Sequence, residues 1–175
     1  MNLEQEVILV NEQDEQTGTM EKLKAHQQGV LHRAFSVFIF NSSGEMLLQQ
    51  RASGKYHSGG LWTNACCSHP GPGEETRSAA SRRLLEELGF TVPIQKAFEF
   101  VYRSSYENGL TEFEFDHVFI GTYDHPVYPD PREVSNTCYQ TMEDIESSLD
   151  SNPEKYTTWF RIAFPLIKDW LKERA

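Results

Sequence analysis

The sequence Trp62-Thr63-Asn64-Ala65-Cys66-Cys67-Ser68-His69-Pro70 places two thiols and an imidazole within four residues. Pro72 and Gly73 then interrupt regular structure, and the run Glu74–Phe90 opens with two acidic residues, which suit the positive end of a helix dipole. Apolar residues in this run recur at three- and four-residue spacing and predict one apolar face of a helix: Ala79, Ala80, Leu84, Leu85 and Leu88. Gly89 is expected to end this helix.

The opposite face of the predicted helix is charged. It carries Arg82, Arg83, Glu86 and Glu87. A face of mixed charge is commonly no more than a solvated, salt-bridged surface, so the helix alone does not identify a site. Further candidates are the pair of carboxylates in Glu112-Phe113-Glu114 and two upstream imidazoles, His26 and His32.

The spacing from Glu74 to Phe90 resembles the Nudix box, G-x5-E-x7-R-E-U-x-E-E-x-G-U, where U is bulky and apolar. Ser68 stands in place of the first glycine, and Arg83 in place of the glutamate that helps bind catalytic metal in Nudix hydrolases. Together with Trp-Thr-Asn-x-x-Cys-x-His-Pro and Glu-x-Glu, the chain resembles the type I isopentenyl-diphosphate Δ-isomerases, a Nudix branch that tolerates this loss. The resemblance extends from about Val7 to about Trp170.

The resemblance implies two cation sites. His26, His32, His69, Glu112 and Glu114 match the ligands of the first, and three imidazoles with two carboxylates suit Zn²⁺, Mn²⁺ or Mg²⁺. Alternation along a strand puts both carboxylates on one face, about 7 Å apart. Glu87 matches the residue that holds Mg²⁺ bridged to a diphosphate. His57, His117 and His125 match no family role and are interpreted as structural.

The resemblance also implies a reaction, the interconversion of isopentenyl and dimethylallyl diphosphate by metal-assisted protonation and deprotonation. Cys67 and Glu114 match the groups on opposite faces of the double bond, Tyr102 the tyrosine that binds the catalytic glutamate, and Trp159 an aromatic lid. Cys66 is expected to face the core. Lys22, Arg51, Lys55 and Arg83 match the residues that bind the diphosphate. At Arg83 a metal ligand would have become a phosphate clamp.

Two other functions are compatible with parts of the sequence. One is a Nudix pyrophosphohydrolase acting on a nucleoside diphosphate derivative, which needs the metal-binding position that Arg83 replaces. The other is a catalytically silent protein with structural zinc. Structural zinc usually takes four ligands, whereas the ligand set here is larger and richer in carboxylates.

Length and charge place limits on the class of protein. The chain of 175 residues is expected to form a single domain over residues 1–175. Its net charge of −10 argues against nucleic acid and anionic membranes as partners. The partner that the resemblance implies is a small prenyl diphosphate. The odd number of cysteines, the acidic start and the absence of an apolar run of about 20 residues predict a cytoplasmic protein. A monomer or a weak homodimer is expected.

Hydrophobic periodicity predicts the remaining elements. Strands are expected at Glu6–Val10, Leu31–Phe40, Glu45–Gln50, Gln95–Ser105 and Leu110–Tyr123, and helices at Met20–Gln28 (capped by Thr19), Tyr139–Leu149 and Thr158–Lys172. Asn11–Gly18, Asn41–Gly44 and Asp124–Pro131 are expected to be turns or loops. The predicted class is α/β, a mixed sheet between helices. The resemblance makes this a Nudix fold with an added N-terminal strand and helix and added C-terminal helices.

Overall fold

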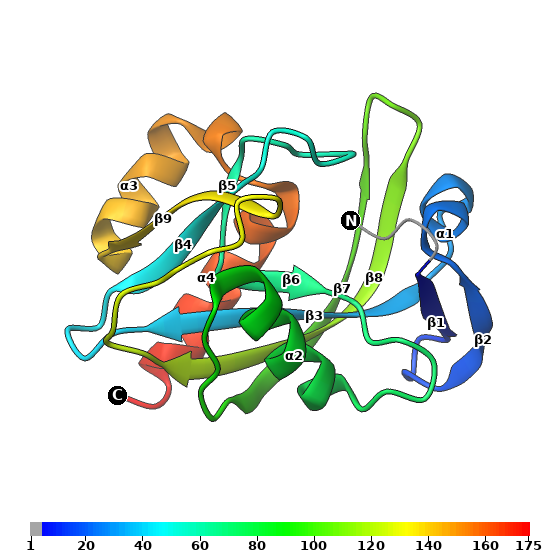
Figure 1. The fold of residues 1–175 in the computed structure, drawn as a ribbon, viewed down its shortest axis with the longest axis horizontal. Helices are drawn as coiled ribbons and strands as arrows, with labels where there is room; N and C mark the ends of the chain where they lie inside the picture. The colour runs from blue at the N-terminus through cyan, green and yellow to red at the C-terminus, as the bar shows by residue number, and fades with distance from the viewer. Residues whose placement is uncertain (1–4) are drawn as a thin grey trace.

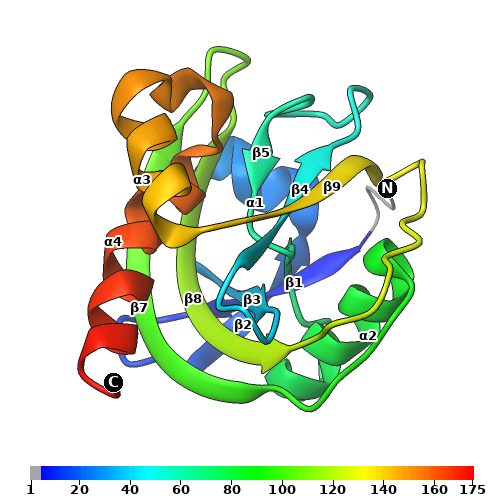
Figure 2. The ribbon, with the colours of Figure 1, turned by 90° about the vertical axis from the view of Figure 1, so that its left-hand side faces the viewer.

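A nine-stranded mixed β-sheet runs through the computed structural model, which describes residues 5–175 (Figure 1). The elements in chain order are β1 (Glu6–Val10), β2 (Gln16–Glu21), α1 (Lys22–Gln28), β3 (His32–Phe40), β4 (Met46–Arg51), β5 (Trp62–Thr63), β6 (Cys66–Ser68), α2 (Thr76–Leu88), β7 (Gln95–Ser105), β8 (Thr111–Thr122), β9 (Val134–Gln140), α3 (Met142–Ser151), the 3₁₀ turn Pro153–Lys155 and α4 (Thr158–Lys172). Helix α2 covers one face of the sheet, and α3 and α4 cover the other (Figure 2). The predicted α/β class is confirmed.

Strand β3 lies at the centre of this arrangement. It pairs in parallel with β8 and antiparallel with β6, and β8 continues into an antiparallel hairpin with β7. Phe35, Val37 and Ile39 pack toward α2, while Phe38 packs toward α4. A strand covered on both faces needs bulky apolar residues at most positions, which explains the run from Val37 to Phe40.

Capping residues determine where helix α2 begins and ends. The carboxylate of Glu75 accepts hydrogen bonds from two amides of the first turn, and Gly89 ends the helix at φ 78°. A Cβ on Gly89 would lie 2.6 Å from the carbonyl oxygen of Tyr128. Glycine is therefore required there both by the backbone conformation and by the close approach of another segment.

Two residues of α2 face the opposite way from the prediction. Leu85, expected on the apolar face, is 51% exposed, and Glu87, expected on the charged face, is only 5% exposed. Glu87 tolerates burial because Gln49 and Arg83 both donate hydrogen bonds to its carboxylate at 3.0 Å. The inward face of the helix thus carries one charged group into the molecule.

The N-terminal region differs from the prediction at Thr19. This residue does not cap a helix but lies in β2, where it pairs with Ile8 of β1. Helix α1 starts after Glu21, whose side chain makes no capping bond. Strand β2 was not predicted because it is an exposed edge of polar residues without alternation. The turn before it is shorter than predicted and is held by Asn11, whose side chain accepts from the amides of Gln13 and Glu15.

The segment before α3 also differs from the prediction. Tyr139 lies in strand β9, which pairs along β4, and the helix begins only after Thr141, whose hydroxyl accepts from the amide of Asp144. Only Val134 of β9 is buried, so this edge strand has no alternating apolar pattern.

Helix α4 has the predicted bounds and lies along β7 (Figure 2). Its inward face carries Trp159, Phe160, Ala163, Phe164 and Ile167. Ile162 and Leu166, predicted on that face, are 36% and 39% exposed. Within residues 5–175, none of the helices has the length and apolar character that crossing a membrane requires.

Candidate active site

On one face of the paired strands β3 and β8, the side chains are polar near the start of each strand and apolar further along. The candidate site lies at the polar end. His32 of β3 is paired with Glu114 of β8, and Ser36 of β3 is paired with Cys67 of β6. Side chains at paired positions point to the same face of a sheet. The thiol of Cys67 and the carboxylate of Glu114 therefore come from the two strands that flank β3, and both line one hollow of about 370 Å³.

A group of four potential ligands lies at the start of β3. One ligand atom from each of His26, His32, His69 and Glu114 lies within 4.8 Å of the others, and all four side chains are buried. The carboxylate of Glu114 is 3.0 Å from Nε2 of His69 and 3.6 Å from Nε2 of His32. Segments distant in sequence thus bring together four of the five residues that the sequence predicts as ligands of the first cation.

Backbone carbonyls fix the tautomers of two of these imidazoles. His26 donates from Nδ1 to the carbonyl of Lys22 at 2.7 Å, and His32 donates from Nδ1 to the carbonyl of Val30 at 2.8 Å. The Nε2 atoms then carry the lone pairs that can bind a cation, and Nε2 of His26 lies 3.5 Å from the hydroxyl of Tyr56. Among residues 5–175, Nε2 of His32 has no hydrogen-bond partner although it is fully buried. The donor set therefore fits a divalent cation.

The electrostatics of the group place a buried negative charge among the imidazoles. Burial favours the neutral form of Glu114, but His69 and His32 outweigh it and hold the pKa of this carboxyl well below its usual range. Burial lowers the pKa of His69 to about 4. For His32, burial is outweighed by the carboxylate of Glu114, which lies 3.6 Å away, beyond hydrogen-bond distance, and its pKa is raised. A proton on His32, or a cation in its place, balances the buried carboxylate.

Glu112, the fifth predicted ligand, lies on the other side of His26. Its carboxylate is 2.8 Å from Nε2 of His57, and His26, His57 and Glu112 form a second group of atoms within 4.8 Å of one another. The hydroxyl of Tyr102 lies within hydrogen-bond distance of an oxygen of Glu112 and, at 3.0 Å, of Glu114. Tyr102 therefore joins the two carboxylates, as predicted for the second of them.

The thiol of Cys67 is held by polar neighbours in the hollow. Its Sγ is 3.1 Å from Oδ1 of Asn64 and 3.4 Å from Oγ of Ser36, and Ser36 in turn donates to Asp116 at 2.7 Å. Burial, and secondarily the charge of Asp116, raise the pKa of Cys67, so its resting form is the neutral thiol. Cys66 points to the opposite face, where it is fully buried in the hydrophobic core as expected.

The indole of Trp159 and the guanidinium of Arg51 line one side of the hollow. Trp159 of α4 is 3% exposed, and the guanidinium of Arg51 lies 5.2 Å from the centre of its ring. Within the described chain, Nε of Arg51 is buried without a hydrogen-bond partner. This wall combines an aromatic face with an unsatisfied cationic donor, which suits an anionic ligand with an apolar body.

The four cations predicted from the sequence lie close to one another. Burial, followed by the positive charges of Arg51 and Arg83, lowers the pKa of Lys22 to about 8. Burial is also the main cause for Lys55, whose pKa falls to about 8; Glu87 opposes this shift, and Arg51, Lys22 and Arg83 add to it. Mutual repulsion of this kind is relieved by a bound polyanion.

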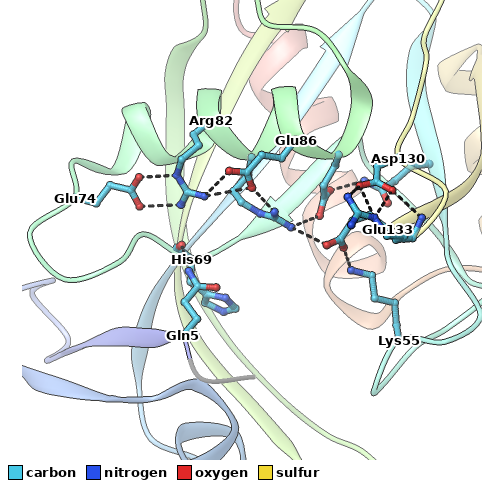
Figure 3. A network of polar contacts seen from close by, with 12 residues as sticks. Gln5, Lys55, His69, Glu74, Arg82, Glu86, Asp130 and Glu133 are labelled. Atoms are coloured by element: carbon cyan, nitrogen blue, oxygen red, sulfur yellow. Dashed lines mark hydrogen bonds and ion pairs between the residues drawn. The ribbon is translucent and has the colours of Figure 1, made fainter. Parts of the chain in front are cut away.

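Figure 3 shows a chain of ion pairs that begins at Glu74 and at Arg82 of α2 and ends at Glu133 and Lys55. Arg82 binds both oxygens of Glu74, at 2.8 and 2.9 Å, and also contacts Glu86. Further along, Glu133, which precedes β9, pairs with Lys55 and lies 3.6 Å from Arg83. The Glu74–Arg82 pair supports the loop before α2, whereas Glu133 balances charge inside the basic cluster.

Comparisons with known proteins identify the family. Residues 30–160 match the family model described as the NUDIX domain. An isopentenyl-diphosphate Delta-isomerase of Pectobacterium atrosepticum is 50% identical over 165 residues, which cover 94% of this chain and 92% of that protein. An isopentenyl-diphosphate Delta-isomerase 2 of Aromatoleum aromaticum is 48% identical over 157 residues, covering 90% and 83%. The chain belongs to the isopentenyl-diphosphate Δ-isomerase branch of the Nudix family.

A solved structure supports the fold of this family member. The crystal structure of DR0079 from Deinococcus radiodurans superimposes with a TM-score of 0.77 at 20% identity, over 91% of this chain and 97% of that one. At this identity the likeness concerns the fold alone.

Three residues at the site of this Nudix chain were not predicted from its sequence. Asp116 could have been, because it continues the alternation of Glu112 and Glu114 along β8. Glu133 follows a proline-rich loop and His57 lies in the loop between β4 and β5, where no periodicity marks the inward side chains. Only the folded chain brings these two residues to the site.

Proposed function

We propose that this protein is an isopentenyl-diphosphate Δ-isomerase, which interconverts isopentenyl and dimethylallyl diphosphate. The observation that carries the proposal is the shared hollow of Cys67 and Glu114, with clustered cations beside it. The shift of the double bond needs a proton added at C4 and another removed from C2. One protonated group and one ionised group are therefore required.

The two proposed catalytic side chains have these opposite states. The raised pKa of Cys67 keeps its thiol neutral, and the lowered pKa of Glu114 keeps its carboxyl ionised. Which of them adds and which removes the proton depends on direction, because the reaction is reversible. Protonation of an alkene creates a tertiary carbocation that water would trap, so Tyr102 and Trp159 are assigned to positioning Glu114 and to excluding water.

His26, His32, His69, Glu112 and Glu114 are the proposed ligands of a divalent ion, Zn²⁺, Mn²⁺ or Mg²⁺. When bound, this ion polarises the carboxyl group of Glu114 and supports proton transfer there. Glu112 lies against His57, and in this position a ligand atom of its carboxylate is within 4.8 Å of a ring nitrogen of His26, which is also a member of the first group.

The diphosphate is assigned to the basic cluster, Lys22, Arg51, Lys55 and Arg83. Arg51 and Arg83 offer guanidinium forks that match phosphate oxygens. Glu87 is the proposed ligand of a Mg²⁺ ion bridged to the diphosphate, since Mg²⁺ in proteins typically uses one or two carboxylates and phosphate oxygens. We further propose a single domain over residues 1–175, a cytoplasmic location, and a monomer or weak homodimer with no nucleic-acid or membrane partner.

Isotope incorporation tests the proposed reaction. The protein, with its divalent ion and Mg²⁺, is incubated with isopentenyl diphosphate in deuterated water. Both Cys67 and Glu114 exchange protons with solvent, so deuterium should enter the new methyl group of dimethylallyl diphosphate. At long times the reverse reaction should carry label into the starting material.

Phosphate release is measured in the same reactions. An isomerase releases neither phosphate nor pyrophosphate, because the diphosphate is held and no water is activated against it. Release of phosphate from a nucleoside diphosphate derivative, without deuterium in any prenyl carbon, would instead identify a Nudix pyrophosphohydrolase and refute the proposal.

A further inference from the structure

His57 is the one histidine of the hollow that matches no family role. It lies in the loop between β4 and β5, yet its side chain is only 5% exposed. Its ring is stacked on Tyr106, with centroids 4.8 Å apart and planes 9° from parallel. The edges of Tyr56 and Trp159 meet it at 77° and 84°. Aromatic contacts on several sides hold this ring in one plane.

The two ring nitrogens of His57 have different partners. Nδ1 lies 3.2 Å from the hydroxyl of Ser58, and Nε2 lies 2.8 Å from the carboxylate of Glu112. A hydroxyl donating to Nδ1 leaves the proton on Nε2, which then donates to Glu112. Ser58 adopts φ 55°, a left-handed conformation that non-glycine residues rarely take. Such local strain is typical of segments that a site holds in place.

The carboxylate of Glu112 has His57 as its imidazole partner, whereas the carboxylate of Glu114 has two other imidazoles beside it. Glu114 is surrounded by His32 and His69, whereas Glu112 has Tyr102 on one oxygen and His57 on the other. His57 is therefore the partner that holds the Oε1 side of the Glu112 carboxylate in place.

His57 also connects the carboxylate to the loop that carries the cations. Its carbonyl oxygen accepts from Arg51 at 3.3 Å, and the side chain of Asn108 donates to the carbonyl of Tyr56 at 3.1 Å. His57 therefore contacts Glu112, a proposed ligand of the divalent ion, through its side chain. Through its backbone it contacts Arg51, which is proposed to bind the diphosphate.

We infer that His57 is a positioning residue: its Nε2–H orients the carboxylate of Glu112 toward the cation and fixes loop 52–61 over the site. This inference rests on the proposed function, because it takes Glu112 as a ligand of the divalent ion. His57 itself does not bind the ion. His26 has only one free nitrogen, so the groups around Glu114 and around Glu112 cannot hold two separate ions through it.

Two substitutions separate the N–H donor of His57 from its packing. His57→Phe keeps a ring against Tyr106 and Trp159 and removes the donor, whereas His57→Gln keeps an N–H at similar reach and loses the ring. His125→Gln, at an exposed position, is the matched control. The metal-stripped full-length proteins are titrated with Mn²⁺ alone, and binding is followed by electron paramagnetic resonance.

We expect His57→Phe to weaken Mn²⁺ binding by about 10- to 100-fold, the usual effect of losing a group that orients a metal ligand. His57→Gln should stay within about threefold of the parent protein. The number of imidazole nitrogens coordinated to Mn²⁺ should be the same in the parent and in His57→Gln. Amides of loop 52–61 should exchange more slowly with solvent after Mn²⁺ is added, except in His57→Phe.

Two results would overturn the inference. Unchanged Mn²⁺ affinity in His57→Phe would show that the donor has no positioning role. One coordinated nitrogen fewer in His57→Gln would show that His57 is a ligand. If His57→Phe does not fold, Ser58→Gly decides, since glycine suits φ 55° while the partner of Nδ1 is lost. A threefold or greater loss of affinity there supports the inference, and unchanged affinity refutes it. Mn²⁺ binding needs no substrate, so failure of the isomerase assay leaves this test intact.

Discussion

Arg83 donates a hydrogen bond at 3.0 Å to Glu87, which lies one turn further along α2. Arg83 occupies the position where the Nudix box has a metal-binding glutamate. Helix α2 therefore carries an ion pair between Arg83 and the buried Glu87, at two positions where the Nudix box has two glutamates. In the proposed function, this exchange replaces a metal ligand by a phosphate-binding group, and the diphosphate brings the Mg²⁺ that Glu87 is proposed to bind.

Arg83→Glu should act mainly on substrate binding. We expect the KM for isopentenyl diphosphate to rise about tenfold or more, since hydrogen bonds to charged groups contribute about 1.5–3 kcal/mol. The value of kcat should fall less. Arg82→Gln is the control, because Arg82 pairs with Glu74 outside the basic cluster. Steady-state kinetics measures KM and kcat separately. An unchanged KM in Arg83→Glu would show that Arg83 does not bind the diphosphate.

Substrate affinity should decrease above pH 8. The pKa values of Lys22 and Lys55 are lowered to about 8, mainly by burial. A diphosphate binds the protonated amines, so affinity is fully present below pH 8 and is lost as the lysines deprotonate. Lys55→Arg should move the rise in KM to higher pH, because arginine stays charged. A KM that does not change between pH 7 and 10 would contradict this assignment.

Protein stability should change with pH in the opposite direction. Lysine in the unfolded chain titrates near its ordinary pKa of 10.5, whereas Lys22 and Lys55 titrate near 8 in the folded protein. Between these values the unfolded state binds more protons, so these two groups make the free energy of unfolding increase with pH. Urea denaturation at pH 8 and pH 10 measures this contribution and shows whether the rise in KM precedes unfolding.

The strands and helices that build the core could be predicted from the sequence. β3, β8 and α4 carry apolar periodicity that a buried element requires, and their bounds agree with the structure within a residue or two. β2 and β9 could not be predicted, because edge strands with few buried side chains have no such pattern. Leu85 and Glu87 were assigned to the wrong faces because an ion pair allows a carboxylate to replace leucine on the inward side.

The candidate site was predictable where a local motif or an alternation marks it. His69 and Cys67 belong to a contiguous motif, and Glu114 belongs to an alternating strand. His57 could not be found in this way, since its position depends on a loop that closes onto β8 through tertiary contacts alone.

Removal of divalent cations should inactivate and destabilise the protein. His26, His32 and His69 surround a carboxylate whose charge needs a counter-ion. Dialysis against a chelator should abolish turnover and lower the thermal midpoint, and Mn²⁺ or Zn²⁺ should restore both. At 100 times Kd a bound ion contributes about 2.7 kcal/mol. His117→Gln should keep its metal content, because His117 pairs with Asp14 away from the cluster. Elemental analysis verifies that the metal has been removed completely. A thermal midpoint that then stays unchanged would contradict the proposed cation site.

The two adjacent cysteines give the sharpest test of register. Strand β6 directs Cys67 into the hollow and Cys66 into the core beside Val37. Cys67→Ala should reduce kcat by at least about a thousandfold, because the group acts at the reacting carbon, and should leave the thermal midpoint nearly unchanged. Cys66→Ala should have the reverse effect, with turnover retained and a loss of about 1 kcal/mol in stability from the small cavity.

Alkylation of the thiols gives an independent measurement of the same register. Iodoacetamide should modify Cys67 in the native protein, slowly near neutral pH because burial raises the pKa of this thiol, and a bound substrate should protect it. Cys66, fully buried, should react only after unfolding. If Cys66 proves to be the protected thiol and Cys66→Ala the inactive variant, the assignment is displaced by one residue. The core side of β6 would then carry the chemistry, and the proposed pairing of Cys67 with Glu114 across β3 would be wrong.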